Sequence, residues 1–192
     1  MPFEQKITIR ALVPGLCDDW LGFFDGDAFR DNPHWASCYC YFNFAPHDVE
    51  DWETRTAVQN RAASEDLIQR GEMHGYLAYV DGKPAGWCNA NLHARFTTLD
   101  DAAIDREHTG AIVCFIVAKP YRGQGVARRL LEAACAGFEA QGLETVEAYP
   151  RKEAASEAGN YHGPLSMYLS AGFEPIREED GVVVVRKRLA GG

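Results

Sequence analysis

Residues 111–142 read AIVCFIVAKPYRGQGVARRLLEAACAGFEAQG, and this stretch decides the fold. It begins with an apolar run rich in β-branched residues, from Ile112 to Val117, which predicts one buried strand. From Val126 onward, apolar residues recur at steps of three and four, the pattern of one face of an amphipathic helix. Gly142 stands where a glycine commonly follows the last helical turn. The stretch therefore predicts a strand, a glycine-containing turn and a helix.

The turn between this strand and this helix has the features of an anion site. The first turn of a helix presents N–H groups without intrahelical partners, at the positive end of the helix dipole. Gly123 and Gly125 carry no Cβ that would keep a bulky anion away from those groups. Arg122 and Arg128 lie on either side with cations suited to phosphate oxygens. Together these residues favour a turn that binds a pyrophosphate-bearing ligand. The alternative, that the glycines serve only the geometry of the turn, is less favoured.

Two segments resemble a known family. Arg122-Gly123-Gln124-Gly125-Val126-Ala127 is similar to the Arg/Gln-x-x-Gly-x-Gly/Ala signature of the GNAT superfamily of N-acetyltransferases. Downstream, Tyr168-Leu169-Ser170-Ala171-Gly172-Phe173 resembles the Tyr-x-x-x-Gly-Phe segment near the end of that fold. The resemblance covers about residues 76–188 and implies one α/β (α+β) domain over residues 1–192. Its sheet would be mixed and mostly antiparallel, with six to seven strands flanked by about four helices.

The resemblance also implies a cosubstrate, acetyl-CoA, and no metal. In such proteins the turn binds the CoA pyrophosphate, while strand amides hold the pantetheine and polarise the acetyl carbonyl. The residues expected to bind the cosubstrate are Phe115, Ile116, Val117, Arg122, Gly123, Gln124, Gly125, Val126, Ala127, Arg128 and Asn160. The family's CoA-contacting asparagine falls on Tyr161 here, with Asn160 one residue before it, so either residue could make that contact.

Acetyl transfer to an amine needs a proton donor for the leaving thiolate and a route for the amine proton. By resemblance, Tyr168 would be the donor, although a tyrosine that only packs the last helix has the same pattern. Glu147 matches a position where some family members carry a catalytic glutamate. His93, Glu50, Glu53 and an ordered water chain are alternatives to Glu147 as the base.

Residues 31–46, DNPHWASCYCYFNFAP, are unusually rich in aromatic side chains. Such a cluster often lines a ligand pocket, because rings give shape and their polar tips orient a substrate. We therefore expect Trp35, Tyr39 and Tyr41 to contact the acceptor, which would be a small or planar amine rather than a protein tail. The alternative is that the cluster only packs a loop onto the core.

The remaining chain predicts elements in the order that this fold requires. Asp81-Gly82 is a two-residue hairpin turn signal, and Glu50, Asp51 and Glu53 suit the beginning of a helix. Expected strands cover residues 6–12, 75–80, 85–92, 145–149, 173–176 and 181–186. Expected helices cover residues 18–24 and 49–70, and residues 161–171 are expected to carry a short helix that Gly172 ends. Residues 93–109 are expected to be an irregular, solvent-facing segment, and residues 150–160 a charged loop.

The composition bounds the partners. A formal net charge of −9 argues against nucleic acid, which requires a basic face. No apolar run reaches membrane-spanning length, and the first ten residues lack the core of a signal peptide, so a cytoplasmic protein without membrane contact is expected. Cys38 and Cys40 lack a second ligand pair at zinc-site spacing, and reduced thiols are expected. A homodimer remains possible.

The sequence thus predicts an N-acetyltransferase that moves an acetyl group from acetyl-CoA to a primary amine by direct attack in a ternary complex. A non-catalytic acyl-CoA-binding or regulatory module on the same fold is the alternative. A dinucleotide-binding turn is disfavoured, because Arg128 stands where its third glycine or alanine should be.

Overall fold

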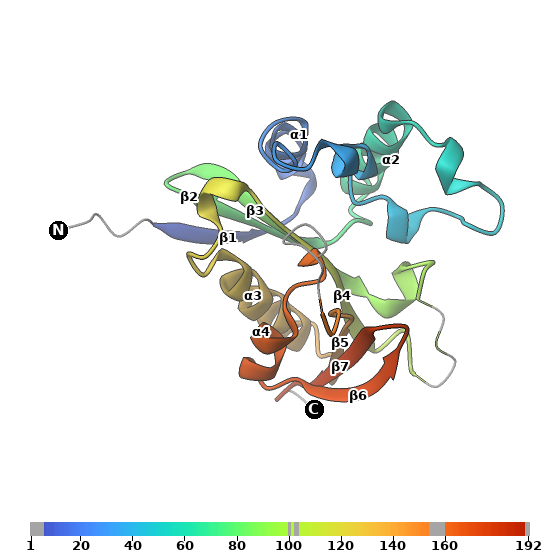
Figure 1. The fold of residues 1–192 in the computed structure, drawn as a ribbon, viewed down its shortest axis with the longest axis vertical. Coiled ribbons are helices and arrows are strands. Elements are labelled where there is room, and N and C mark those ends of the chain that lie inside the picture. Colours follow the sequence, from blue (N-terminus) through green and yellow to red (C-terminus); the bar gives the residue numbers. More distant parts are fainter. Residues whose placement is uncertain (1–5, 100, 102–103, 154–159, 191–192) are drawn as a thin grey trace.

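The computed structural model describes residues 6–99, 101, 104–153 and 160–190. Its centre is one seven-stranded sheet with the strand order β1-β2-β3-β4-β5-β7-β6 (Figure 1). Only the β4–β5 pair is parallel, so the sheet is mostly antiparallel, as predicted. The strands are β1 (Ile7–Ala11), β2 (Gly75–Val80), β3 (Lys83–Leu92), β4 (Thr109–Val117), β5 (Thr145–Ala148), β6 (Glu174–Glu179) and β7 (Val182–Arg188).

Helices cover both faces of this sheet (Figure 1). The α-helices are α1 (Cys17–Asp25), α2 (Ala57–Gln69), α3 (Val126–Ala140) and α4 (Leu165–Ser170). Short 3₁₀ turns are η1 (Pro14–Leu16), η2 (Pro33–Cys38), η3 (Phe42–Phe44), η4 (Trp52–Thr54), η5 (His93–Arg95) and η6 (Lys119–Tyr121). In the described part of the chain, no helix is both long and apolar enough to cross a membrane.

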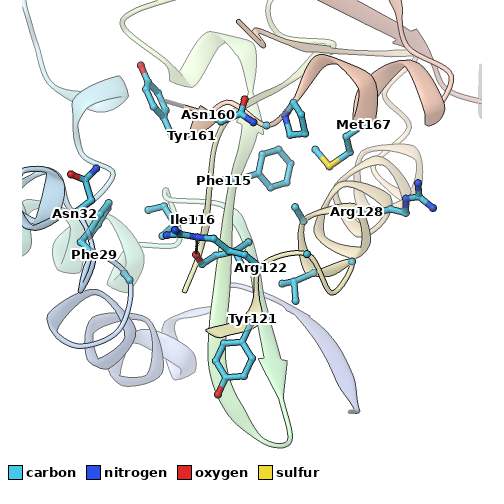
Figure 2. Close-up of a pocket in the computed structure, with 18 of the residues that line it drawn as sticks. Phe29, Asn32, Phe115, Ile116, Tyr121, Arg122, Arg128, Asn160, Tyr161 and Met167 are labelled. Carbon is cyan, nitrogen blue, oxygen red and sulfur yellow. Dashed lines mark hydrogen bonds between the residues drawn. The ribbon is translucent and has the colours of Figure 1, made fainter. Parts of the chain in front are cut away.

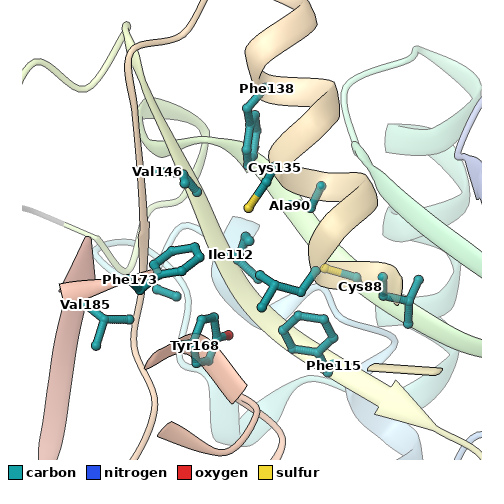
Figure 3. Close-up of a cluster of buried hydrophobic side chains, with 14 of the residues drawn as sticks. Cys88, Ala90, Ile112, Phe115, Cys135, Phe138, Val146, Tyr168, Phe173 and Val185 are labelled. Atoms are coloured by element: carbon teal, nitrogen blue, oxygen red, sulfur yellow. The ribbon is translucent and has the colours of Figure 1, made fainter. Parts of the chain in front are cut away.

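The core lies in two layers, one on each face of the sheet. Side chains of α3, α4 and the sheet form the first layer, in which Ile112, Phe115, Phe138 and Tyr168 meet (Figure 3). Trp20 and Phe24 of α1 pack with Trp87 of β3 in the second layer. The sheet is therefore covered on both faces, which explains why β4 reads as a continuous apolar run.

Local sequence signals account for the best-predicted elements. Asp81 and Gly82 both have positive φ, +49° and +82°, as the tightest hairpin turn requires, and the predicted β2–β3 hairpin is confirmed. Helix α3 ends where Gly142, at φ +78°, donates to the Glu139 carbonyl and Leu143 donates to the Phe138 carbonyl. These two hydrogen bonds form a Schellman motif, which confirms the predicted end of the helix.

The predicted helix over residues 49–70 begins in the wrong place. Thr56 and Gln59 form a reciprocal capping box, and α2 therefore begins at Ala57. The carboxylates expected at its first turn lie before it: Asp51 caps the short η4 turn, and Glu50 pairs with Arg55. The apolar residues continue on both sides of Thr56, so their spacing does not mark this boundary. The capping box does, and it sets the first residue of the helix.

One expectation near the C-terminus is confirmed and one before β4 needs correction. The short helix expected within residues 161–171 is α4, which begins after Pro164, a residue with an extended backbone. The segment of residues 93–109 is not simply solvent-facing, since His93 and Phe96 are buried and Phe96 belongs to the second core layer. Periodicity alone does not reveal such anchors in an irregular segment.

Candidate active site

Strand β4 leaves its neighbour halfway along its length. The parallel pairing with β5 runs from Thr109–Thr145 to Ile112–Ala148, while β4 continues to Val117. On the other side the β3–β4 register skips Val113, which forms a β-bulge. Beyond the bulge, the hydrogen-bonding alternation of an antiparallel pair turns the N–H groups of Phe115 and Val117 away from β3. These groups therefore face the edge that β5 has left open.

Residues 160–163 lie along part of this open edge. The Phe115 N–H donates to the Tyr161 carbonyl at 2.5 Å. The His162 Nδ1 is 2.8 Å from the Val113 carbonyl, which can only accept, so Nδ1 carries the proton. Burial lowers the pKa of His162 to about 4, so the ring is neutral at neutral pH. The segment thus replaces β5 as the partner of β4 at Val113 and Phe115.

The glycine turn has the geometry of an anion cradle. Gly123 and Gly125 adopt φ of +73° and +82°, and a Cβ on either would meet no atom within 4 Å. Both glycines therefore border open space in a conformation that other residues rarely adopt. No side chain of the described residues caps the N-terminus of α3, which leaves its first N–H groups available to a ligand. The turn fits the pyrophosphate that the sequence predicts.

Arg122 holds this turn in place. Its Nε donates to the Val117 carbonyl at 2.9 Å, and its two terminal nitrogens bind the Asp31 carboxylate at 2.6 and 3.1 Å. These hydrogen bonds hold the pKa of Asp31 below its usual value. Gln124 turns back to donate to the Pro120 carbonyl. Arg122 thus joins the end of β4 to the loop before η2.

A cavity of about 420 Å³ extends from the glycine turn along the open edge of β4 (Figure 2). We call it the larger cavity. Its walls include all the residues predicted to bind the cosubstrate except Gln124, namely Phe115, Ile116, Val117, Arg122, Gly123, Gly125, Val126, Ala127, Arg128 and Asn160. Tyr161 lines it as well, so the structure brings both candidates for the asparagine position to the same site. Their contacts with a cosubstrate stay predictions.

A second cavity, of about 280 Å³, lies beside the first, and we call it the smaller cavity. The two share Phe29, Trp35, Ile116 and Tyr161. The rings of Trp35 and Tyr161 meet edge to face, with centroids 4.7 Å apart. The remaining walls are His34, Ser37, Cys38, Cys40, Phe42, Asn43, Trp52 and Cys114. The aromatic segment therefore does form a pocket next to the open strand edge.

Of the three residues predicted to contact the acceptor, the structure places only Trp35 in a cavity wall. The Tyr39 hydroxyl donates to Asp25, and its ring stacks on Phe24. The Arg55 guanidinium lies over the Tyr41 ring, and its central carbon is 4.6 Å from the ring centroid. Tyr39 and Tyr41 line neither of the two cavities. Their side chains instead attach the aromatic segment to α1 and to the loop before α2.

Tyr168 lies beneath the larger cavity rather than in its wall. It is completely buried between Phe115 and Phe173 (Figure 3), and its hydroxyl donates to the His162 carbonyl at 2.6 Å. Burial raises the pKa of Tyr168, so the phenol keeps its proton at neutral pH. Its neighbour Met167 lines the cavity. A role as proton donor stays a prediction.

Glu147 is likewise outside both cavities. Only 1% of the residue is exposed, and Arg186 donates to its carboxylate through Nε at 2.8 Å and a terminal nitrogen at 2.5 Å. The Tyr149 hydroxyl donates to the other oxygen at 3.2 Å. With both oxygens engaged, Glu147 is placed as a structural anion, and this geometry does not favour the predicted role as general base.

The alternative bases also lie outside the cavities. His93 is buried, which lowers its pKa, and its Nδ1 accepts a hydrogen bond from Arg106. Glu50 is paired with Arg55, and Glu53 lies on η4.

Among the described residues, no three or more histidine, cysteine or acidic side chains gather as a metal site. Burial raises the pKa of Cys38 to about 12, which keeps this thiol protonated.

Sequence reasoning did not single out several residues in the cavity walls. Phe29 and Asn32 reach the larger cavity from the loop after α1, and Trp52 reaches the smaller one from η4. No local motif marks them, because their position depends on how α1 and α2 pack on the sheet. The Gly163-Pro164 pair, in contrast, is a local turn signal that the sequence does contain. Gly163 has a φ of +80° and also lines the larger cavity.

Comparisons with known proteins agree with this geometry. A family model described as "Acetyltransferase (GNAT) family" matches residues 31–162. No curated protein gave a significant match. Among solved structures, an acetyltransferase of the GNAT family from Streptococcus pneumoniae is 17% identical with a TM-score of 0.58, covering 96% of this chain and 100% of that one.

Two other solved structures contain coenzyme A or acetyl-CoA. The paiA N-acetyltransferase from Thermoplasma acidophilum, in complex with coenzyme A, is 14% identical with a TM-score of 0.58 and covers 95% of this chain and 99% of its own. The yncA acetyltransferase from Salmonella typhimurium, with acetyl-CoA, is 15% identical with a TM-score of 0.53 and covers 97% and 95%. At these identities the likeness shows the fold, while the family match covers more than half of the sequence. The chain belongs to the GNAT family of acetyltransferases.

Proposed function

We propose that this protein is an N-acetyltransferase that transfers the acetyl group of acetyl-CoA to a primary amine of a small molecule. The observation that carries the proposal is the larger cavity, which joins an open strand edge to a glycine turn and an uncapped helix N-terminus. A pyrophosphate suits the turn, and an extended pantetheine chain suits the strand edge. The adjoining smaller cavity would hold the acceptor.

The roles follow from the placement of the groups. The amides of residues 123–128 would hold the pyrophosphate, and the N–H groups of Phe115 and Val117 would hold the pantetheine and polarise the acetyl carbonyl. Tyr168, which keeps its proton at neutral pH, would donate it to the leaving thiolate. To do so, its hydroxyl must give up the hydrogen bond to the His162 carbonyl and donate to the sulfur instead. We assign no role in proton transfer to Glu147.

One observation favours the second candidate, a non-catalytic acyl-CoA-binding module. The Phe115 N–H is bonded to the Tyr161 carbonyl, and the Tyr168 hydroxyl to the His162 carbonyl. Two groups that acetyl transfer requires are thus both occupied by the same short segment. A binding module has no need to release either of them.

Release of free CoA from acetyl-CoA, measured with a panel of amines, separates the two candidates. The enzyme should release CoA in an amine-dependent way, and Tyr168→Phe should lower kcat about 100-fold, the lower end of the usual range for a lost acid. The KM for acetyl-CoA should change little. As a control, Tyr149→Phe removes a partly buried hydroxyl that lies outside both cavities and should leave kcat largely intact. Binding of acetyl-CoA without CoA release by any amine would instead establish the binding module.

The expectations about location and partners stay predictions. A cytoplasmic protein with no nucleic-acid or membrane partner agrees with the net charge of −9. A homodimer is equally untested, and sedimentation of the purified protein would decide it.

A further inference from the structure

The smaller cavity has walls without charged side chains. Among the described residues, none of the twelve that line it is aspartate, glutamate, lysine or arginine. Five of them are aromatic: Phe29, Trp35, Phe42, Trp52 and Tyr161. The polar groups that remain are those of His34, Ser37 and Asn43 and the thiols of Cys38, Cys40 and Cys114. These walls therefore offer an entering ammonium ion no carboxylate as a counter-ion.

The thiols do not supply the missing negative charge. Burial raises the pKa of Cys38 to about 12. The pKa of Cys40 is also well above its usual value, through a hydrogen bond with Cys114 and through burial. Both side chains are therefore neutral at physiological pH. They behave as small apolar groups in the cavity wall.

Three carboxylates on the surrounding elements are paired with arginines, and no carboxylate lines the smaller cavity itself. Asp31 binds Arg122, and Glu50 binds Arg55. Glu147, the buried carboxylate predicted as the base, binds Arg186. An alkylammonium entering the smaller cavity would lose its hydration without gaining an anion, and it would meet no carboxylate to accept its proton.

We propose, on the basis of the acetyl transfer proposed above, that the acceptor is an aromatic amine, whose nitrogen is uncharged at neutral pH. Its lone pair is partly delocalised into the ring, so it needs neither a counter-ion nor a base before it attacks. Five aromatic walls provide stacking and edge-to-face contacts for a flat ring. A cavity of about 150 Å³ already binds benzene, so the smaller cavity, at about 280 Å³, has room for a substituted ring.

The reaction balances without a further reactant. The nitrogen lone pair forms a C–N bond to the acetyl carbonyl carbon, and the C–S bond breaks with its electron pair on sulfur. The proton that the nitrogen loses ends on that sulfur. The products are an N-aryl acetamide and free CoA.

A pair of isomeric amines tests the substrate class. 4-Methylaniline and benzylamine contain the same atoms, but only benzylamine is a cation at pH 7.5. We expect kcat/KM for CoA release to be at least about tenfold higher with 4-methylaniline, which corresponds to ~1.4 kcal/mol. Equal or faster reaction with benzylamine, or with a cationic polyamine such as spermidine, would overturn the inference and leave the proposed acetyl transfer intact. Acetyl-CoA binding without CoA release by any of these amines would contradict the acetyl transfer itself.

A charge placed inside the smaller cavity sharpens the test. The Asn43 side-chain oxygen accepts from Thr98 at 2.7 Å, so Asn43→Asp keeps the shape and this hydrogen bond while adding one negative charge. We expect the preference between the two isomers to shift about tenfold toward benzylamine. Gln141→Glu adds the same charge at the exposed end of α3 and should leave the preference unchanged.

An unchanged preference in a folded Asn43→Asp protein would contradict the inference. If that variant does not fold, Ser37→Asp tests the same point from η2, because the Ser37 backbone carbonyl, not its side chain, accepts from Asn60. The preference is the ratio of the kcat/KM values of one variant for the two isomers. A general loss of stability would not produce it.

Discussion

The larger and smaller cavities share a wall but are built from different parts of the protein. The larger cavity is formed around main-chain groups: the open edge of β4, the glycine turn and the first turn of α3. The smaller one is formed mainly by side chains from η2, η3 and η4, together with Cys114 and Ile116 of β4. Main-chain geometry demands particular residues in a local order, whereas a side-chain wall can change composition without changing the fold.

This difference separates two questions about the protein. In the proposed function, the larger cavity would bind acetyl-CoA and the smaller one the acceptor. Substitutions in one cavity should therefore change the kinetics of one substrate and leave those of the other nearly unchanged. The predictions below use this contrast.

The largest effect is expected from Gly125→Ala in the larger cavity. Gly125 has a φ of +82°, and its new Cβ would enter the open space beside the first turn of α3. We expect CoA binding to weaken tenfold or more, because one lost hydrogen bond to a charged group costs about 1.5–3 kcal/mol. Titration calorimetry with CoA measures this effect, and the KM for the amine should change little.

The control for backbone strain is Gly181→Ala. Gly181 lies in the β6–β7 turn at φ +75°, and its Cβ would also meet nothing within 4 Å. Both variants should lose roughly 1 kcal/mol of unfolding free energy, the cost of a left-handed residue with a side chain. Only Gly125→Ala should lose CoA affinity. Equal CoA affinity in the two variants would show that the turn does not bind the anion.

A smaller effect, on the acceptor instead of CoA, is expected from Phe42→Ala in the smaller cavity. Phe42 packs on Trp52, with ring centroids 5.0 Å apart, and lines only this cavity. Loss of the ring should raise the KM for the acceptor about fivefold, since truncation of a contact residue commonly costs about 1 kcal/mol. The affinity for CoA should stay as it was. Val49→Ala, at an exposed residue outside both cavities, is the control.

If Phe42→Ala instead weakens CoA binding as much as amine binding, the two cavities form one site. The contrast between main-chain and side-chain walls would then have no functional meaning. Steady-state kinetics with each substrate varied in turn gives both quantities from one set of measurements.

The smallest effect concerns the ion pair between Arg122 and Asp31, which joins the glycine turn to the loop before η2. Asp31→Asn should lower the unfolding free energy by less than about 1 kcal/mol, as is usual for a pair that solvent still reaches. The folded state lowers the pKa of Asp31. Its contribution is therefore complete above the unfolded pKa of about 3.9 and is lost as the pH falls below it.

Denaturant unfolding of the wild type and of Asp31→Asn checks this dependence. The difference in unfolding free energy should be largest at pH 6–7 and shrink toward pH 3 and below, as the pH falls through the lowered pKa of Asp31 in the folded state. A difference that stays constant over this range would mean that Asp31 acts through shape alone.

The sequence predicts the strand, turn and helix well because their signals are local. The apolar run of β4, the positive-φ glycines and Gly142 each act within a few residues of their position. The beginning of α2 was mispredicted because a short polar box, Thr56 with Gln59, overrides a longer apolar pattern. The competing signal, Thr56 three residues before Gln59, is present in the sequence.

The side-chain directions in the candidate site could not be predicted in the same way. Tyr39 and Tyr41 belong to a segment of 3₁₀ turns, in which no fixed period assigns side chains to one face. Glu147 lies on β5 as expected, but its partner Arg186 comes from β7, and the sequence alone does not pair these two strands. Long-range pairing decides such contacts.

The ring pair Trp35–Tyr161 has a thermodynamic consequence, because it borders both cavities at once. Any ligand that shifts these rings in one cavity also changes the free energy of binding in the other. Linkage then requires the two substrates to alter each other's affinity by the same factor. A single pair of binding titrations, each with and without the other ligand, would therefore measure how strongly this wall couples the donor to the acceptor.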